Sequence, residues 1–134
     1  SAEVTYKDGK QEGLATQWHE NGQKSAEVTY KDGKQEGPYT KWHENEQMSE
    51  QGIYKDGKRE GLMNTWYPNG KIYQEGEYRN GERNGSWIFW RVDGQKWTEG
   101  AYKDGKKEGL WILWDEDGKE VSRKNHKDGE EVAE

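Results

Sequence analysis

Short segments in which apolar and polar residues alternate recur along this chain, and each segment ends at a glycine-containing turn. Alternation with a period of two is typical of β-strands, and Asn-Gly or Asp-Gly between two such segments is a strong hairpin signal. About 12 residues are available for each strand with its turn, which leaves no room for crossover helices. The pattern therefore predicts an all-β chain folded as an antiparallel meander.

The alternating pattern repeats with a period of 24 residues, and the segment SAEVTYKDGKQEG at 1–13 occurs again unchanged at 25–37. Four series share this period: Tyr6, Tyr30, Tyr54, Tyr78 and Tyr102; Trp18, Trp42, Trp66, Trp90 and Trp114; Gly9 to Gly129; and Gly13 to Gly109. A fixed period of this length indicates repeats that pack on their neighbours. We expect one elongated, single-layer sheet of about ten strands built from β-hairpin repeats.

The chain is expected to form one repeat domain, 1–134. Its hairpin units are placed at residues 14–37, 38–61, 62–85, 86–109 and 110–129, with a partial repeat at 1–13 and a tail at 130–134.

A two-residue turn at Asn21-Gly22 sets the expected register, in which each Tyr of the series covers a cross-strand glycine. The expected pairs are Gly13 with Tyr30, Gly37 with Tyr54, Trp18 with Ser25, Trp66 with Tyr73, and Trp90 with Trp97. A bulge near Gly37 and its equivalents would alter this register. Glu46 replaces the turn glycine of its repeat, and Glu at positive φ is costly, so we expect that turn to differ from the others.

The amino-acid composition limits the thickness of the core and the classes of partner that the chain can bind. Only 28% of residues are hydrophobic and 36% are charged, yet the chain has eight Trp and eight Tyr. Such an aromatic content predicts an ordered but thin structure. The net charge of −6 disfavours nucleic acid as a partner, because phosphate recognition needs a basic face. The absence of cysteine excludes disulfides.

Four apolar residues of the C-terminal repeats do not belong to the periodic Tyr and Trp series. Period-two counting places them on one face: Trp87, Phe89, Trp111 and Leu113. A one-layer sheet has no second layer to cover them, so either the C-terminal tail or a protein partner is expected there. They form the candidate protein-binding patch. The periodic Trp and Tyr could stack on sugars or bases, but we interpret them as the core of the sheet.

Catalysis and metal binding are not expected. Most carboxylates recur at turns, as Asp32 and Glu36 do, which is typical of a scaffold. His19 and His43 share a repeat position about 9.6 Å apart, too far for one zinc ion, so both are expected to be exposed polar residues. KDGKQEG lacks the spacing of a phosphate-binding loop. No cofactor is predicted.

The segment Tyr73-Gln-Glu-Gly-Glu-Tyr-Arg-Asn-Gly-Glu-Arg-Asn-Gly85 resembles the MORN repeat, and residues 97–109 match the same pattern. The longer unit is similar to the MORN-variant repeat of bacterial proteins. The first units depart from it, since Val4 and Val28 replace the glycine that Gly52, Gly76 and Gly100 keep, and Ser25 and Ser49 replace an aromatic residue. The resemblance implies an elongated twisted sheet.

For function, the resemblance implies protein binding, and most concretely an antitoxin or immunity protein that binds a protein toxin. An acidic binder would suit a basic toxin. The alternatives are a structural or assembly protein of the cell envelope, with homo-oligomers formed through open edge strands, and peripheral lipid binding, which the net charge disfavours on anionic membranes. Both the bacterial cytoplasm and the envelope remain open as compartments.

Overall fold

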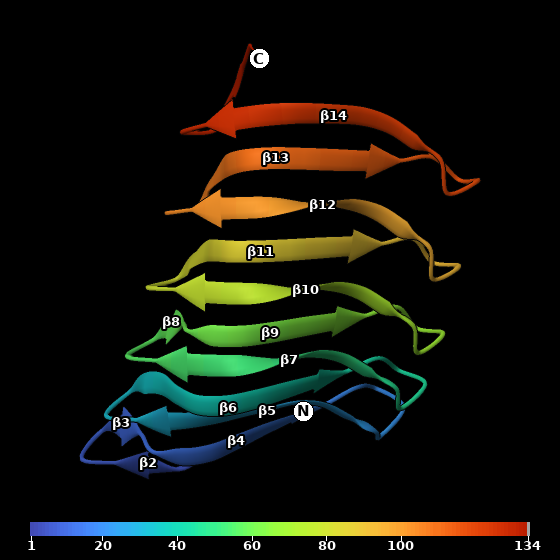
Figure 1. Ribbon diagram of the computed structural model, residues 1–134. Coiled ribbons are helices and arrows are strands. Elements are labelled where there is room, and N and C mark those ends of the chain that lie inside the picture. The colour runs from blue at the N-terminus through green and yellow to red at the C-terminus, as the bar shows by residue number, and fades with distance from the viewer. Residues whose placement is uncertain (134) are drawn as a thin grey trace.

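The computed structural model describes residues 1–133, and all of their regular structure is β. A 13-stranded sheet within these residues runs in the order β1-β4-β5-β6-β7-β9-β10-β11-β12-β13-β14-β15, with β8 beside β7; β2 and β3 form a separate pair. Figure 1 shows the long strands stacked in one layer from the N- to the C-terminus. The predicted single-layer antiparallel meander is confirmed, and the strands exceed ten because short segments such as β1, β8 and β15 also pair.

The N-terminal half holds strands β1 (Ala2–Glu3), β2 (Tyr6–Lys7), β3 (Lys10–Gln11), β4 (Gly13–Trp18), β5 (Lys24–Lys31), β6 (Lys34–Trp42), β7 (Met48–Lys55), β8 (Lys58–Arg59) and β9 (Gly61–Trp66). The C-terminal half holds β10 (Ile72–Arg79), β11 (Glu82–Trp90), β12 (Lys96–Lys103), β13 (Lys106–Trp114), β14 (Glu120–Lys127) and β15 (Glu130–Val132). Residues 130–132, at the start of the predicted tail, thus pair with β14.

The strands are joined by different turns at their two ends, which Figure 1 shows on the left and on the right. We call these two sides of the sheet the Asp-Gly edge and the Asn-Gly edge, after the turns that they carry. At the Asp-Gly edge both residues of the turn have positive φ, as in Asp32 (51°) and Gly33 (83°), and Lys31 pairs with Lys34. These are the two-residue type I′ turns that the sequence predicts. The Asp-Gly pairs therefore act as tight hairpin turns.

The Asn-Gly edge has a longer loop, and the two-residue turn predicted there is wrong. Of Asn21 and Gly22, only Gly22 has positive φ, and the N–H of His19 donates to the carbonyl of Gln23 at 2.8 Å. The side-chain oxygen of Asn21 accepts the Gln23 N–H at 2.9 Å, which stabilises the wider loop.

This wider loop changes the register at the end of each strand pair. Gly13 pairs with Tyr30 and Gly37 with Tyr54, so the predicted pairing of glycine with tyrosine is confirmed. The predicted partners of the tryptophans are wrong by one residue, because each second strand carries one extra residue at a bulge. The observed pairs are Trp18 with Lys24, Trp66 with Ile72 and Trp90 with Lys96.

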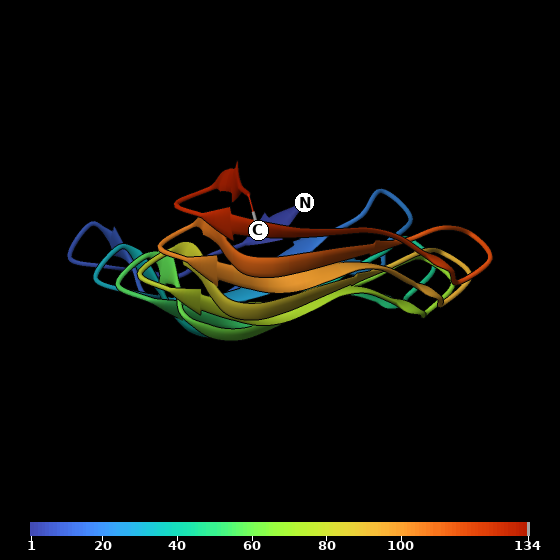
Figure 2. The same ribbon diagram turned by 45° about the horizontal axis from the view of Figure 1, so that its top comes forward.

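A second bulge lies where the sequence analysis allowed for one. The register between β5 and β6 shifts between Val28 and Tyr30, opposite Gly37, which has φ of 87°. Bulges increase local twist and bend strands. Figure 2 shows the result, a sheet curved along its strands rather than a flat layer.

The prediction that the turn at Glu46 differs from the others is wrong. Glu46 adopts φ of 72°, and its N–H donates to the carbonyl of His43 at 3.1 Å, as Gly22 donates to His19. The turn keeps the shape of its siblings because Asn45 accepts the Gln47 N–H through its side chain at 3.0 Å. Glu46 is thus held in a conformation that an L-residue adopts at a cost.

Hydrogen bonds join each repeat to the next at both edges. At the Asp-Gly edge the N–H of Gly33 donates to the carbonyl of Gln11 at 2.9 Å, and the later turn glycines repeat this bond. At the Asn-Gly edge a side chain donates to the backbone carbonyl of the tryptophan one repeat on. The donors are His19 to Trp42, His43 to Trp66, Tyr67 to Trp90 and Arg91 to Trp114, at 2.7–3.0 Å.

The two histidines are therefore partly buried, and their predicted role as exposed polar residues is wrong. The signal that could have identified them is their place immediately before a turn that stacks on the next repeat. Each imidazole stabilises the contact between adjacent repeats.

Replacing Glu46 with Gly should raise the free energy of unfolding by about 1 kcal/mol, because glycine adopts positive φ without a steric cost. Denaturant unfolding of the two proteins measures this difference. Gly22→Glu is the reciprocal control, since nothing lies within 4 Å of an added Cβ there and only the backbone cost changes. It should be destabilising by a similar amount. An unchanged or lower stability of Glu46→Gly would contradict this account.

Candidate protein-interaction surface

The four predicted patch residues lie on one face, with Trp87 and Phe89 on β11 and Trp111 and Leu113 on β13. We call this face the core face. The predicted exposure of the two tryptophans is wrong, because Trp87 is 0% and Trp111 only 5% exposed. Phe89 is partly exposed and Leu113 is 36% exposed. The structure therefore divides the predicted patch into two core residues and two accessible ones, and whether the latter bind a partner stays a prediction.

Glycines on the neighbouring strands explain why the two indoles are buried. The ring of Trp87 lies against Gly76, and that of Trp111 against Gly100, so closely that a Cβ on either glycine would overlap the ring. The sheet is bulged beside both glycines. Because a bulge leaves backbone groups unpaired, the carbonyls of Glu77 and Ala101 can each accept an indole N–H at 3.0 Å.

Side chains of the same face cover the outer surface of these indoles. The guanidinium of Arg83 lies over the Trp87 ring at 4.8 Å, and Tyr78 meets that ring edge-on at 5.2 Å. Lys107 covers Trp111 in the same way at 4.7 Å, with Tyr102 edge-on at 5.0 Å. Neither a second layer nor a partner is needed, because cations and tyrosines of adjacent repeats exclude water from the rings.

One repeat position is buried in all five units. Its five occupants are Ala15, Tyr39, Met63, Trp87 and Trp111. Across the strand pair that follows, Ala15 faces Val28, Tyr39 faces Gly52 and Trp87 faces Gly100, but Trp111 faces Lys124. The buried side chain is smallest in the first unit and largest in the last two.

Tyr39 also anchors the most closely linked polar group on the core face. Its hydroxyl donates to Glu50 at 2.6 Å, while Arg59 contacts the same carboxylate oxygen at 3.1 Å and the Tyr39 hydroxyl at 3.3 Å. Burial, followed by the hydrogen bond to Glu50, raises the pKa of Tyr39 well above its usual 10.0. A phenol kept neutral in this way is unsuited to nucleophilic chemistry, so the cluster fits a structural role.

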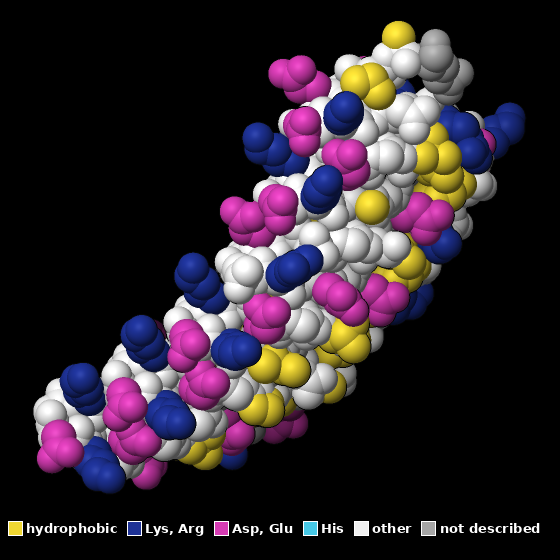
Figure 3. Space-filling view, turned by 60° about the vertical axis from the view of Figure 1, so that its left-hand side comes forward, with side chains coloured by type: hydrophobic (Ala, Val, Ile, Leu, Met, Phe, Trp, Pro, Cys, Tyr) yellow, Lys and Arg dark blue, Asp and Glu magenta, His cyan; other side chains and the backbone are white. Residues whose placement is uncertain are grey.

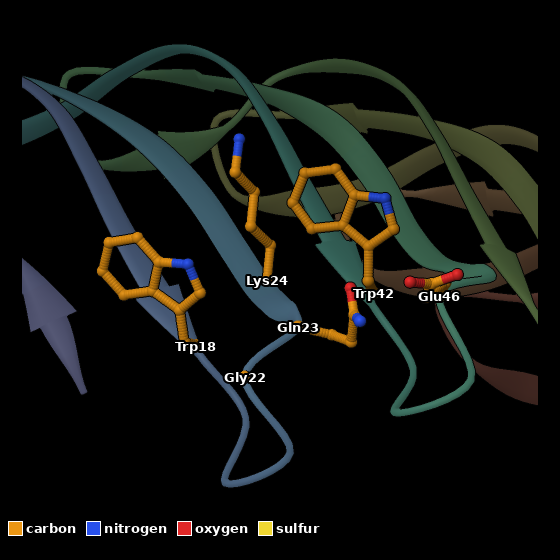
Figure 4. A pocket seen from close by; sticks show the side chains of 6 residues that line it. All are labelled: Trp18, Gly22, Gln23, Lys24, Trp42 and Glu46. Atoms are coloured by element: carbon orange, nitrogen blue, oxygen red, sulfur yellow. The ribbon is translucent and has the colours of Figure 1, made fainter.

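The opposite face carries a row of five tryptophans, one from each repeat, which we call the tryptophan ladder: Trp18, Trp42, Trp66, Trp90 and Trp114. We call this side of the sheet the ladder face. All five are partly exposed, although the sequence analysis assigned the periodic tryptophans to the core. Figure 4 shows Trp18 and Trp42 on neighbouring repeats with their rings in the same orientation and Lys24 between them. Gly22, Gln23 and Glu46 complete this groove.

The ladder face also exposes aliphatic side chains along the strands. Leu62 is 66% exposed, Leu14 54%, Ile53 44% and Leu110 37%. Shallow grooves beside them are lined by Ile88 and Ile112. Figure 3, with the Asp-Gly edge turned forward, shows hydrophobic side chains in a row beside alternating positive and negative ones.

The sequence contained a signal for this division of the tryptophans. Trp87 and Trp111 each have a glycine at the bulge of the preceding strand, Gly76 or Gly100, whereas ladder tryptophans stand next to a turn and opposite Lys24, Met48, Ile72, Lys96 or Glu120. The glycine on the preceding strand therefore marks the tryptophans whose rings are buried. In residues 1–133, no group of three or more His, Asp or Glu side chains is arranged to hold a metal ion, and no helix is long and apolar enough to cross a membrane.

Comparison with known proteins identifies the repeat. The family model of the MORN repeat variant matches residues 11–32, 35–56 and 59–80, three consecutive units. No curated protein matches the sequence. Among solved structures, "Crystal Structure of TarM" is similar over 78% of this chain at 11% identity and a TM-score of 0.42. "Crystal structure of GtfA/B complex bound to UDP and GlcNAc" is similar over 84% at 12% identity and 0.33. The similar region is 21% of each of those chains.

Gly100→Ala should lower the free energy of unfolding by about 2 kcal/mol, because the added methyl group overlaps the Trp111 ring and forces it to move. Chemical denaturation checks the value. In a Trp111→Ala background the same substitution should cost much less, since the obstructing ring is gone. Additive effects of the two substitutions would show that glycine is not required for the ring.

Tyr39 should ionise only at a pH well above the usual value for tyrosine. Because its folded-state pKa exceeds the unfolded 10.0, this group stabilises the fold at neutral pH and the contribution is lost as the pH rises above about 10. In an ultraviolet titration, Tyr39→Phe should have one fewer tyrosine that ionises at high pH than the native chain. Tyr6→Phe, at a ring 65% exposed, is the control and should leave this number unchanged. Equal titration curves for both variants would refute the burial effect.

Proposed function

Because this chain belongs to the MORN repeat variant family, whose repeats are interaction modules, we propose that it is a non-catalytic protein-binding scaffold. The observation that carries this proposal is the ladder face. There a one-layer sheet exposes Leu62, Leu110 and the tryptophan ladder, with no covering layer among residues 1–133. A large apolar patch of this kind is typical of a docking surface.

The partner we propose is a basic protein toxin, which the chain binds as an antitoxin or immunity protein. A net charge of −6 favours association with a basic surface, because complementary charges accelerate encounter and orient the two proteins. Aromatic side chains on a preformed surface suit tight binding, since they bury much area at little cost in conformational entropy. Neither feature depends on a catalytic group.

The test starts from capture with the tagged chain in its native cells, followed by expression of the captured protein alone and with the chain. We expect one stoichiometric protein that stops growth alone and is neutralised by co-expression. Raised salt should weaken the purified complex, because rim charges are screened. Self-copies alone would favour a structural protein that assembles through its edge strands. Flotation with lipid vesicles, and no protein partner, would favour the lipid-binding alternative.

Two matched variants then locate the interface. Leu62→Glu with Leu110→Glu places charges on the ladder face and should weaken partner binding at least about tenfold, because buried charges lose their hydration. Leu113→Glu does the same on the core face, at the patch predicted from sequence, and should change affinity less than about twofold. The reverse result would transfer the interface to Phe89 and Leu113.

A further inference from the structure

We propose that the tryptophan ladder binds a proline-rich segment in the polyproline II conformation that also carries arginine or lysine. This inference rests on the proposed protein-binding function and gives the chemistry of the partner. Four features of the ladder support it: its spacing, its free hydrogen-bond donors, the side chains between its rings, and the charge beside it.

The spacing of the ladder matches the pitch of polyproline II. Successive ladder tryptophans are separated by two strands, which is about 9.6 Å at the usual strand spacing. Polyproline II advances about 9.3 Å every three residues, and every third side chain projects on the same side. Consecutive prolines of a three-residue repeat can therefore enter consecutive grooves, such as the one between Trp18 and Trp42 in Figure 4.

The hydrogen-bonding groups are complementary as well. Trp87 and Trp111 of the core donate their indole N–H to backbone carbonyls, but within residues 1–133 none of the ladder indoles donates such a bond. Nor are the ladder nitrogens among the buried groups that lack a partner, so they reach solvent. A proline-rich segment has free backbone carbonyls and few N–H groups. The ladder thus supplies the donors that this kind of ligand needs.

The side chains between the central rings favour proline over a sugar. Met48, 40% exposed, lies beside Trp42, and Ile72 lies beside Trp66. A pyrrolidine ring can pack on these apolar groups, whereas the hydroxyls of a saccharide would lose hydration there without polar partners. The lysines at the two ends, Lys24 and Lys96, are each paired with a glutamate of the same strand.

The loops next to the ladder account for the positive charge expected in the ligand. Their carboxylates are Glu20, Glu44, Glu46, Asp93, Asp115, Glu116 and Asp117, against the cationic Lys71, Arg91 and Lys119. The loops are therefore net negative along one side of the grooves. Arginine or lysine between the prolines can pair with these carboxylates and fix the position of the segment.

The ladder is also preorganised for binding. The backbone carbonyl of each of the four tryptophans from Trp42 onward accepts a hydrogen bond from the preceding repeat, such as that from Tyr67 to Trp90 at 2.7 Å. These bonds fix the backbone beneath each ring. A rigid surface and a ligand that is already extended both lose little entropy on binding.

Two labelled peptides of about thirteen residues test the spacing directly, a length that spans the ladder. They have the same composition, with arginine at both ends, and differ only in having proline at every third or at every fourth residue. Fluorescence anisotropy with the full chain should show that the three-residue spacing binds at least about fivefold more tightly. Equal affinities, or no saturable binding of either peptide, would overturn the proposal.

Variants on the two faces test the site. Trp66→Ala should weaken binding of the three-spaced peptide by about tenfold, and Trp66→Phe, which keeps a ring but removes the N–H donor, should have an intermediate effect. Trp97→Ala is the control, because this ring is 39% exposed but does not belong to the ladder. Met48→Glu tests the groove without removing a ladder ring, and thermal unfolding checks that each variant folds. Unchanged binding in Trp66→Ala and Met48→Glu would refute the site.

The two proposals fail in different ways. If the captured partner binds the native chain and Trp66→Ala equally well, the ladder proposal fails while the scaffold function stands. If a β-linked oligosaccharide binds in a Trp66-dependent way and the peptides do not, the ladder is a sugar site and the proline proposal is wrong. If neither peptide nor any protein binds, both proposals fail.

Discussion

In a one-layer sheet, a large side chain can leave water only by lying along the backbone of its own sheet, and glycine provides the space for it. Trp87 against Gly76 and Trp111 against Gly100 show this contact most fully. The bulges beside the glycines leave a backbone carbonyl without its partner on the next strand, and the indole N–H donates to that carbonyl instead. Packing, curvature and hydrogen bonding therefore depend on the same contact.

The contact is not equally developed along the chain. Val28, which replaces the family glycine, faces Ala15 on one side and Tyr39 on the other, and the Tyr39 ring lies against Gly52. Toward the C-terminus, glycine and tryptophan occur together. Edge bonds such as that between His19 and the Trp42 carbonyl link all units regardless of their core size. These hydrogen bonds from side chain to backbone thus keep the spacing between repeats regular, although the core residues differ in size.

The meander, its period and the pairing of glycine with tyrosine could be predicted from sequence, because they depend on local turn chemistry and alternation. The ends of the strands could not. The side chain of Asn21 widens its loop, and the extra residue shifts the partner of Trp18 from Ser25 to Lys24. The exposure of the candidate patch was also mispredicted, because period-two counting gives the face of a residue but does not show that the rings of Trp87 and Trp111 lie against glycines of the preceding strand.

This distinction separates two kinds of tryptophan with different consequences for function. The indoles of Trp87 and Trp111 use their N–H groups and their faces within the fold, so removing them affects stability first. The ladder tryptophans make smaller burial contributions and keep both their ring edges and their donors available. Since the repeat fixes their spacing through the strands beneath them, the proposed ligand would be recognised by its period as much as by its chemistry. On that proposal, the ladder selects extended segments whose repeat matches two strand spacings.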